Sequence, residues 1–179
     1  MTSTAPAGTA APQQTAAPTT DRPVRVPRRL DVDGLAPGFS AALADLDSAA
    51  TAELDRAGVD PALREIVRLR ASQLNGCAYC VDTHARDARA AGLRTQQVDA
   101  VAVWRESSAF TARQRAALEL AESVTLAPQT RVPGSVVTAA TDVFGEQGTT
   151  ALLALVVAIN AWNLVGVTAR CWSAPVVED

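Results

Sequence analysis

Two cysteines and the only histidine of the chain fall within eight residues of one another. Cys77, Cys80 and His84 are separated by three and four residues, so on a helix all three side chains would line one face. A thiolate is the nucleophile in thiol chemistry, and the amino terminus of a helix favours the ionised sulfur. Because Asn75 and Gly76 predict a turn just before Cys77, we expect the first sulfur at a helix start and the second one turn inside.

This spacing suits a redox-active dithiol with its own base. Cysteines three residues apart on a helix can close a disulfide, and His84, one turn beyond Cys80, can exchange a proton with it. Peroxide chemistry requires one thiolate that takes up oxygen as a sulfenic acid and a second thiol that resolves it. The three residues therefore predict a dithiol that cycles through a disulfide.

Two other interpretations of the cysteines stay open at this stage. A structural zinc site needs four ligands, and the chain has no second cysteine pair or second histidine, although Glu65 could serve as the fourth ligand. The cysteines could also be inert, because free cysteine is among the most buried residue types. The register of His84 with both sulfurs favours redox chemistry, and we predict neither a bound metal nor a cofactor.

Glu65 lies on a predicted helix that runs into the dithiol turn. Asp60 followed by Pro61 is typical of a helix start, and an apolar stripe follows at Leu63, Ile66, Val67 and Leu74. Brought back across the turn, the Glu65 carboxylate could relay a proton or orient His84. Spacing alone leaves it equally open that Glu65 is a solvated acid beside Arg64 and Arg68.

The pattern of Glu65, Cys77, Cys80 and His84 resembles the signature of the alkylhydroperoxidase D-like branch of the carboxymuconolactone decarboxylase family. Further segments are similar to family segments in the same order, so the resemblance covers about residues 29 to 172; they are 29–31, 69–73, 87–92, 104–105 and 159–163. The complete pattern of four residues is specific, whereas a bare CxxC pair would not be.

The resemblance implies an all-helical, thiol-dependent peroxidase that reduces organic hydroperoxides or hydrogen peroxide. It implies that Cys80 is the peroxidatic sulfur, Cys77 the resolving one, and Glu65 with His84 the proton relay. It also implies that an external dithiol, such as a lipoyl-bearing protein, returns the electrons. The helix terminus alone would instead favour Cys77 as the thiolate, and Tyr79 stands where some relatives carry another histidine.

Two further activities compete with peroxide reduction. The decarboxylase branch is similar in fold but lacks the paired cysteines, so retention of both sulfurs argues against a lactone decarboxylase. A general dithiol-disulfide oxidoreductase remains open.

Composition indicates one soluble domain in a chain of 179 residues with 48% hydrophobic residues. A net charge of −3 argues against a nucleic-acid surface. Residues 1–28 are rich in Ala, Pro and Thr and predict a disordered tail without the features of an export peptide, and residues 29–179 form the domain. We therefore expect a cytoplasmic protein, in which a CxxC pair is more plausibly catalytic than structural, and we expect Cys171 to be a packed thiol.

The helical periodicity predicts an all-α bundle of six or seven helices. The expected helices begin at Ser40, with Leu43, Leu46, Ala50 and Leu54 on one face, and end with two that cover 134–144 and 149–170. Between them, Gly92 should stop the dithiol helix, Thr95 should open the next, and Thr111 with Gln114 has the form of a capping box.

The last predicted helix is apolar nearly all round, which predicts burial and a homo-oligomer rather than a membrane span. Trp104, Trp162 and Asn160 could border the site, since they lie in segments similar to the family, and core packing is the alternative role for the tryptophans.

Overall fold

A computed structural model describes residues 24–174, and this part of the chain is all-helical, as predicted. The elements are α1 (Val32–Leu35), α2 (Pro37–Arg56), α3 (Pro61–Asn75), α4 (Ala78–Ala90), α5 (Thr95–Ala100), the 3-10 helix η1 (Val101–Glu106), α6 (Ala112–Thr125), α7 (Ala127–Thr130) and α8 (Gly134–Ala169). The number of helices exceeds the six or seven predicted because α1 and α7 have four residues each, too few to show a helical periodicity of apolar residues in the sequence. Most of the predicted tail, up to residue 23, lies outside the described residues.

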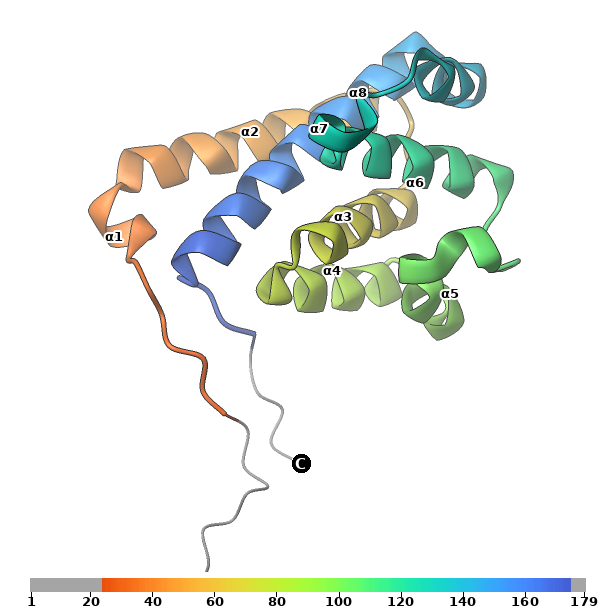
Figure 1. Ribbon diagram of the computed structural model, residues 1–179. Helices are drawn as coiled ribbons and strands as arrows, with labels where there is room; N and C mark the ends of the chain where they lie inside the picture. Colours follow the sequence, from red (N-terminus) through yellow and green to blue (C-terminus); the bar gives the residue numbers. More distant parts are fainter. Residues whose placement is uncertain (1–23, 175–179) are drawn as a thin grey trace, which may run out of the picture.

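Helix α3 lies at the centre of the fold and positions the dithiol turn. It packs against α4, α6 and α8, and α8 also packs along α2 (Figure 1). The largest fully buried side chains come from five of the elements and the loop before α3, and they include Leu54, Val59, Ile66, Val101, Leu118 and Leu155. The end of α3, where the chain turns towards the cysteines, is therefore held from several sides.

Local sequence signals set most helix boundaries as predicted. The Asp60 carboxylate accepts a hydrogen bond from the Leu63 N–H at 2.8 Å and so caps α3. Thr111 and Gln114 form the expected capping box of α6. The break between the last two predicted helices falls at Gly145, whose φ of 70° and ψ of 171° interrupt α8. Of the four residues predicted on one face of α2, Leu43, Ala50 and Leu54 are buried, whereas Leu46 is 41% exposed.

Helix α8 is long and apolar enough to cross a membrane by length and composition alone. It nevertheless packs on α2, α3 and α6 and contributes part of the core. Its Asn163 is completely buried and donates to the Ser72 hydroxyl of α3 at 3.0 Å. The Asn75 amide donates to the side-chain oxygens of Asn160 and Asn163 at 2.7 and 3.0 Å. These hydrogen bonds fasten the end of α3, two residues before Cys77, to α8.

Candidate active site

The turn between α3 and α4 places the first cysteine at the start of a helix, as the sequence predicted. Gly76 ends α3 with a φ of 70°, a left-handed conformation that glycine adopts without strain. Cys77 is the N-cap residue of α4, and its sulfur accepts a hydrogen bond from the Cys80 backbone N–H at 3.4 Å. The Cys77 sulfur thus receives one of the free N–H groups of the helix terminus, which favours its ionised form.

Cys77 and Cys80 are joined in a disulfide, with their Cα atoms 5.3 Å apart, so the structure represents the oxidised dithiol. The two residues are 2% and 4% exposed. Helix α8 packs directly over the bond, because a Cβ atom on Gly166 would lie 2.8 Å from the Cys77 sulfur and 3.7 Å from the Cys80 sulfur. In this form neither sulfur is a thiolate that could bind zinc.

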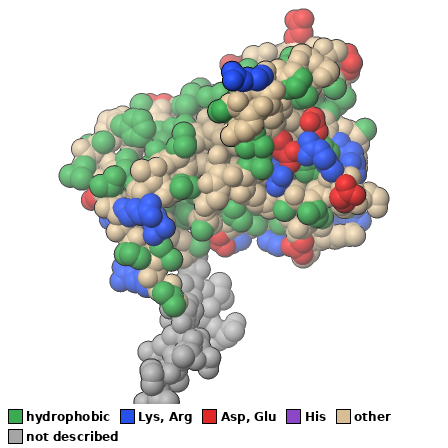
Figure 2. Space-filling view, viewed as in Figure 1, with side chains coloured by type: hydrophobic (Ala, Val, Ile, Leu, Met, Phe, Trp, Pro, Cys, Tyr) green, Lys and Arg blue, Asp and Glu red, His purple; other side chains and the backbone are tan. Residues whose placement is uncertain are grey.

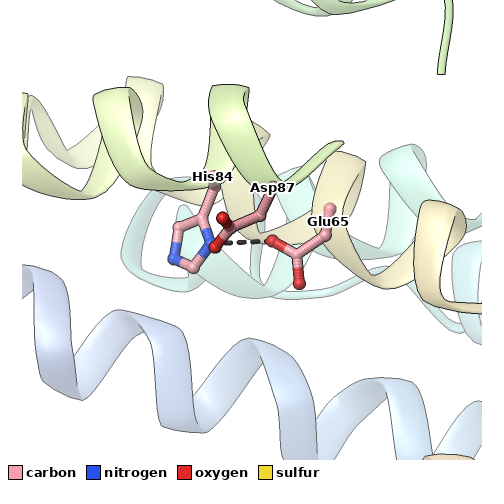
Figure 3. Close-up of side chains that lie close together, drawn as sticks. All are labelled: Glu65, His84 and Asp87. Atoms are coloured by element: carbon pink, nitrogen blue, oxygen red, sulfur yellow. Dashed lines mark hydrogen bonds and ion pairs between the residues drawn. The ribbon is translucent and has the colours of Figure 1, made fainter. Parts of the chain in front are cut away.

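Glu65 lies against His84, across the turn, rather than in solvent. The two side chains come from α3 and α4, and His84 Nδ1 is 2.9 Å from Glu65 Oε2 (Figure 3). The second Glu65 oxygen accepts from Arg68 at 2.7 Å, and Arg68 also reaches Asp47 at 3.3 Å. Burial opposes ionisation of Glu65, but the hydrogen bond from His84 and the charge of Arg68 outweigh it, and its pKa lies below the ordinary value. Because an ionised carboxylate only accepts, His84 donates from Nδ1 and keeps Nε2 free.

A pocket of about 400 Å³ opens beside this pair and reaches Cys80. Its lining has a polar part and an apolar part: Asp47, Glu65, Arg68, Thr83, His84 and Asp87 on one hand, and Tyr79, Cys80, Ile159, Trp162 and Trp172 on the other. Cys77 is not among the lining residues. The two sulfurs therefore differ: Cys77 lies at the helix terminus, and Cys80 lies at the pocket.

Three side chains in the pocket could hold a divalent cation. One ligand atom each from Glu65, His84 and Asp87 lies within 4.8 Å of the other two (Figure 3). The zinc set considered from the sequence would have joined Glu65 and His84 with both sulfurs, whereas this cluster contains neither. Glu65 already accepts hydrogen bonds from His84 and Arg68, so a cation would compete with both donors.

Of the three residues that the sequence suggested could border the site, one lines the pocket and two do not. Trp162 lines the pocket, while Trp104 is 4% exposed and donates to Glu122 at 2.9 Å, away from the cysteines. Asn160 supports Asn75 rather than lining the pocket. Trp172 was missed, since a tryptophan beyond the last predicted helix has no periodic pattern to place it. The free Cys171 beside it is partly buried, which raises the pKa of its thiol.

The sequence profile of the Carboxymuconolactone decarboxylase family matches residues 37–123. The uncharacterized protein YdfG of Bacillus subtilis is 33% identical over 112 residues, which cover 63% of this chain and 76% of that protein. The chain belongs to the carboxymuconolactone decarboxylase family. The uncharacterized protein YnjA of Escherichia coli is 36% identical over 105 residues, covering 58% of this chain and 57% of the relative.

One solved structure agrees with this assignment and with the alkylhydroperoxidase D-like branch. A protein of unknown function from Agrobacterium tumefaciens, provisionally named the antioxidant defence protein AhpD, aligns with a TM-score of 0.77 and 29% identity. The alignment covers 84% of this chain and all of that protein (100%). The debrominase Bmp8 shares the fold, with a TM-score of 0.66 and 17% identity over 76% of this chain and 72% of Bmp8.

Proposed function

We propose that this protein is a thiol-dependent peroxidase that reduces organic hydroperoxides through the Cys77 and Cys80 pair. One observation carries the proposal: the Cys80 sulfur, already bonded to Cys77, lines a pocket that it shares with the Glu65 and His84 pair. Membership of the family and the likeness to an antioxidant protein support an enzyme of this class.

In the first step the Cys80 thiolate attacks the terminal oxygen of the hydroperoxide. A sulfur–oxygen bond forms and the oxygen–oxygen bond breaks, so Cys80 becomes a sulfenic acid and the organic fragment leaves as an alkoxide. Protonated His84 gives the alkoxide its proton, and the product is the alcohol. The ionised Glu65 holds the imidazole through Nδ1 and stabilises its charged form.

In the second step the Cys77 thiol attacks the Cys80 sulfenic acid. The disulfide forms, and the hydroxyl group leaves with the thiol proton as water. The hydrogen bond from the Cys80 N–H favours the Cys77 thiolate, which makes Cys77 a good resolving nucleophile.

An external dithiol then restores both thiols. Its thiolate attacks Cys80 from the pocket and expels Cys77 as a thiolate, which the helix terminus stabilises as a leaving group. The second thiol of the reductant releases Cys80 and closes the disulfide of the reductant. In total, one hydroperoxide and one dithiol give one alcohol, one water and one disulfide. A lipoyl-bearing protein has the required dithiol chemistry.

The different surroundings of the sulfurs support these roles. A helix terminus alone favours Cys77 as the more acidic thiol, but Cys77 is 2% exposed and does not line the pocket. The attacking sulfur has to meet the substrate, whereas the resolving sulfur has to meet only Cys80. We therefore assign peroxide reduction to Cys80 and resolution to Cys77.

The experiment is peroxide consumption with a dithiol reductant, compared between wild type and Cys80→Ser. We expect activity to fall at least about 1,000-fold, since the serine hydroxyl is not ionised at neutral pH. Cys171→Ser is the control, because that thiol is outside the pair, and it should keep activity within about twofold of wild type. In Cys77→Ser one peroxide equivalent should leave a sulfenic acid on Cys80 that dimedone traps. Unchanged activity of Cys80→Ser would refute the proposal.

A general dithiol-disulfide oxidoreductase is the second candidate. The pocket argues against a protein disulfide as the main oxidant, because Cys80 is only 4% exposed and is reached through a cavity suited to a small molecule. Reduction of insulin by the reduced protein at a higher rate than hydroperoxide consumption would favour this alternative.

We further propose a cytoplasmic homo-oligomer. Several apolar side chains of α2 and α8 are exposed, namely Phe39, Leu46, Leu153, Val157 and Leu164. Figure 2 shows apolar side chains spread over the region of α1 and α2, while arginine and acidic side chains gather towards α6. Burial of this surface between copies would stabilise an assembly. Light scattering after size exclusion measures its mass, and a monomer at micromolar concentration would contradict the proposal.

A further inference from the structure

The wall of the pocket includes a residue from the segment that follows the last helix. Helix α8 ends at Ala169, and Arg170 caps it with a left-handed φ of 48°. Two residues later the Trp172 ring reaches the pocket beside Cys80. This segment lies outside residues 37–123, which match the family profile.

Trp172 completes an aromatic cluster at the sulfur. Its ring centroid lies 5.8 Å from that of Tyr79, which stands between the two cysteines, and 5.3 Å from that of Trp162 on α8. A Cβ atom on Gly166 would lie 3.6 Å from Trp172 Cζ3 and 3.7 Å from the Cys80 sulfur. The indole edge and the sulfur therefore approach the same point on α8.

The amino-terminal segment holds the indole in place. Trp172 Nε1 donates to the Asp33 carboxylate of α1 at 2.9 Å, and the Ser40 hydroxyl donates to the other Asp33 oxygen at 2.8 Å. The backbone N–H groups of Arg29 and Leu30 both donate to the Ala169 carbonyl, at 2.9 and 3.0 Å. The two ends of the described chain thus contact each other, and the ring is oriented by a charged partner that does not line the pocket.

Size and charge limit what the pocket can take. A volume of about 400 Å³ is in the range of small-molecule sites and far exceeds the space that hydrogen peroxide needs. The lining has three carboxylates, Asp47, Glu65 and Asp87, against one guanidinium, Arg68, and one imidazole, His84, which is a cation only when protonated. Arg68 is paired with Glu65 and Asp47, and His84 with Glu65, so an anionic substrate would find no unpaired cation among these lining residues and would be repelled.

We infer that Trp172 is a specificity-determining residue that selects neutral hydroperoxides with an aromatic or similarly bulky apolar group, and that Asp33 is its positioning residue. The inference rests on the proposed peroxidase function. The organic group packs between Trp172, Trp162 and Tyr79, while the peroxide oxygens lie between Cys80 and the polar part with His84. Aromatic side chains favour such rings through both apolar burial and stacking.

Steady-state kinetics with cumene hydroperoxide and hydrogen peroxide test the inference. In Trp172→Ala we expect kcat/KM for cumene hydroperoxide to fall about tenfold, mainly through KM, and that for hydrogen peroxide to stay within about twofold. Trp172→Phe should recover most of the loss because it keeps a ring. An equal loss for both oxidants, or no loss for either, would overturn the inference.

A double-mutant cycle tests the role of Asp33. Asp33→Ala alone should raise KM for cumene hydroperoxide by about threefold and leave the kinetics with hydrogen peroxide unchanged. When it is added to Trp172→Ala, it should not raise KM for cumene hydroperoxide any further. Asp45→Ala is the control: it removes an exposed carboxylate of α2 and should leave the kinetics with both oxidants unchanged. If Asp33→Ala and Trp172→Ala effects simply multiply, Asp33 does not act through the indole.

A binding measurement separates this inference from the peroxidase proposal. The alcohol product of cumene hydroperoxide, 2-phenyl-2-propanol, cannot oxidise a thiol, so it can be titrated into the disulfide form while the indole N–H signals are followed by NMR. The Trp172 signal, assigned with Trp172→Phe, should shift, while that of Trp104, bonded to Glu122 away from the pocket, should not. A Trp172 shift without peroxide turnover by the wild type would support the role of Trp172 in binding aromatic groups and refute the peroxidase proposal. Peroxide turnover without a Trp172 shift would refute only the role of Trp172.

Discussion

Two carboxylates form ion pairs with arginines of helix α3, the partly buried Glu65 and the buried Glu122, and their surroundings differ in one respect that matters. Glu65 on α3 accepts from Arg68 and His84. Glu122 on α6 accepts from Arg70 of α3 at 2.5 Å, from the Trp104 indole at 2.9 Å and from Arg105. Burial opposes ionisation of Glu122, but hydrogen bonds from Arg105, Trp104 and Arg70 outweigh it, so both glutamates have pKa values below the ordinary range.

The difference is whether a partner can change its protonation state. The donors to Glu122 are two guanidiniums and an indole, none of which gives up a proton at physiological pH. Glu65 instead holds a histidine, and that histidine shares a pocket with a cysteine. Glu122 also borders a cavity of about 310 Å³, but neither histidine nor cysteine lines it. A lowered carboxylate pKa beside a cavity therefore does not identify a reactive site; a titratable partner next to a sulfur does.

Glu65→Gln should have the largest effect of the variants that test this comparison, because it removes the charge that stabilises protonated His84. The amide can still accept from His84 but cannot stabilise its charged form, so we expect kcat/KM for a hydroperoxide to fall about 100- to 1,000-fold. The melting temperature should change by only a few degrees, since Arg68 keeps Asp47 as its partner. Peroxide-dependent oxidation of the reduced protein, followed by stopped flow, measures the effect.

Glu53→Gln is the matched control for that variant. Glu53 is an exposed acid paired with Arg56 on α2, so its loss should leave both rate and stability unchanged. If Glu65→Gln reacts as fast as wild type, Glu65 is a structural acid like Glu122 and the contrast between them disappears.

Glu122→Ala should damage stability rather than chemistry. Its removal leaves Arg70, 15% exposed, without its carboxylate, and we expect a loss of about 3 kcal/mol, or about 6–12 °C in melting temperature. The rate per folded molecule should stay within about twofold of wild type. Glu119→Ala is the control: Glu119 pairs with the same Arg105 but is 40% exposed, so its removal should cost less than about 1 kcal/mol.

The pH dependence of the Glu122→Ala effect provides a second measurement. Because the pKa of Glu122 is lower in the folded than in the unfolded state, its contribution is complete above the ordinary value of 4.5 and is lost as pH falls through the folded value. The difference in melting temperature between wild type and Glu122→Ala should therefore be constant above pH 5 and shrink below it. A difference that grows on acidification would contradict the ionised network.

How far the sequence predicted this molecule depends on how local each interaction is. The cap at Asp60, the turn at Gly76 and the cysteine at the helix start follow from neighbouring residues, and all were predicted. The His84 partnership of Glu65 crosses between two helices, so spacing could not choose it over a solvated acid. Trp172 and Asp33, 139 positions apart, meet only when both ends of the described chain have folded.

Gly166→Ala sharpens the comparison by making stability depend on redox state. A methyl group there would lie 2.8 Å from the Cys77 sulfur in the disulfide form, closer than carbon and sulfur can pack, so α8 or the disulfide has to move. In the reduced form each sulfur can rotate away independently, because no bond fixes the two together. We expect the oxidised variant to lose about 1–2 kcal/mol and the reduced variant less than half of that, measured as melting temperatures with and without a dithiol.

Gly38→Ala, on α2 with nothing near the added methyl, should destabilise neither form. The hydrogen-bond donors to Glu122 are Arg70, Trp104 and Arg105, and neither cysteine is one of them. The loss of stability in Glu122→Ala should therefore be the same in both redox states. Equal losses for oxidised and reduced Gly166→Ala would mean that α8 responds to the added volume alone, and that the redox state of the cysteines is not communicated to the helix packed over them.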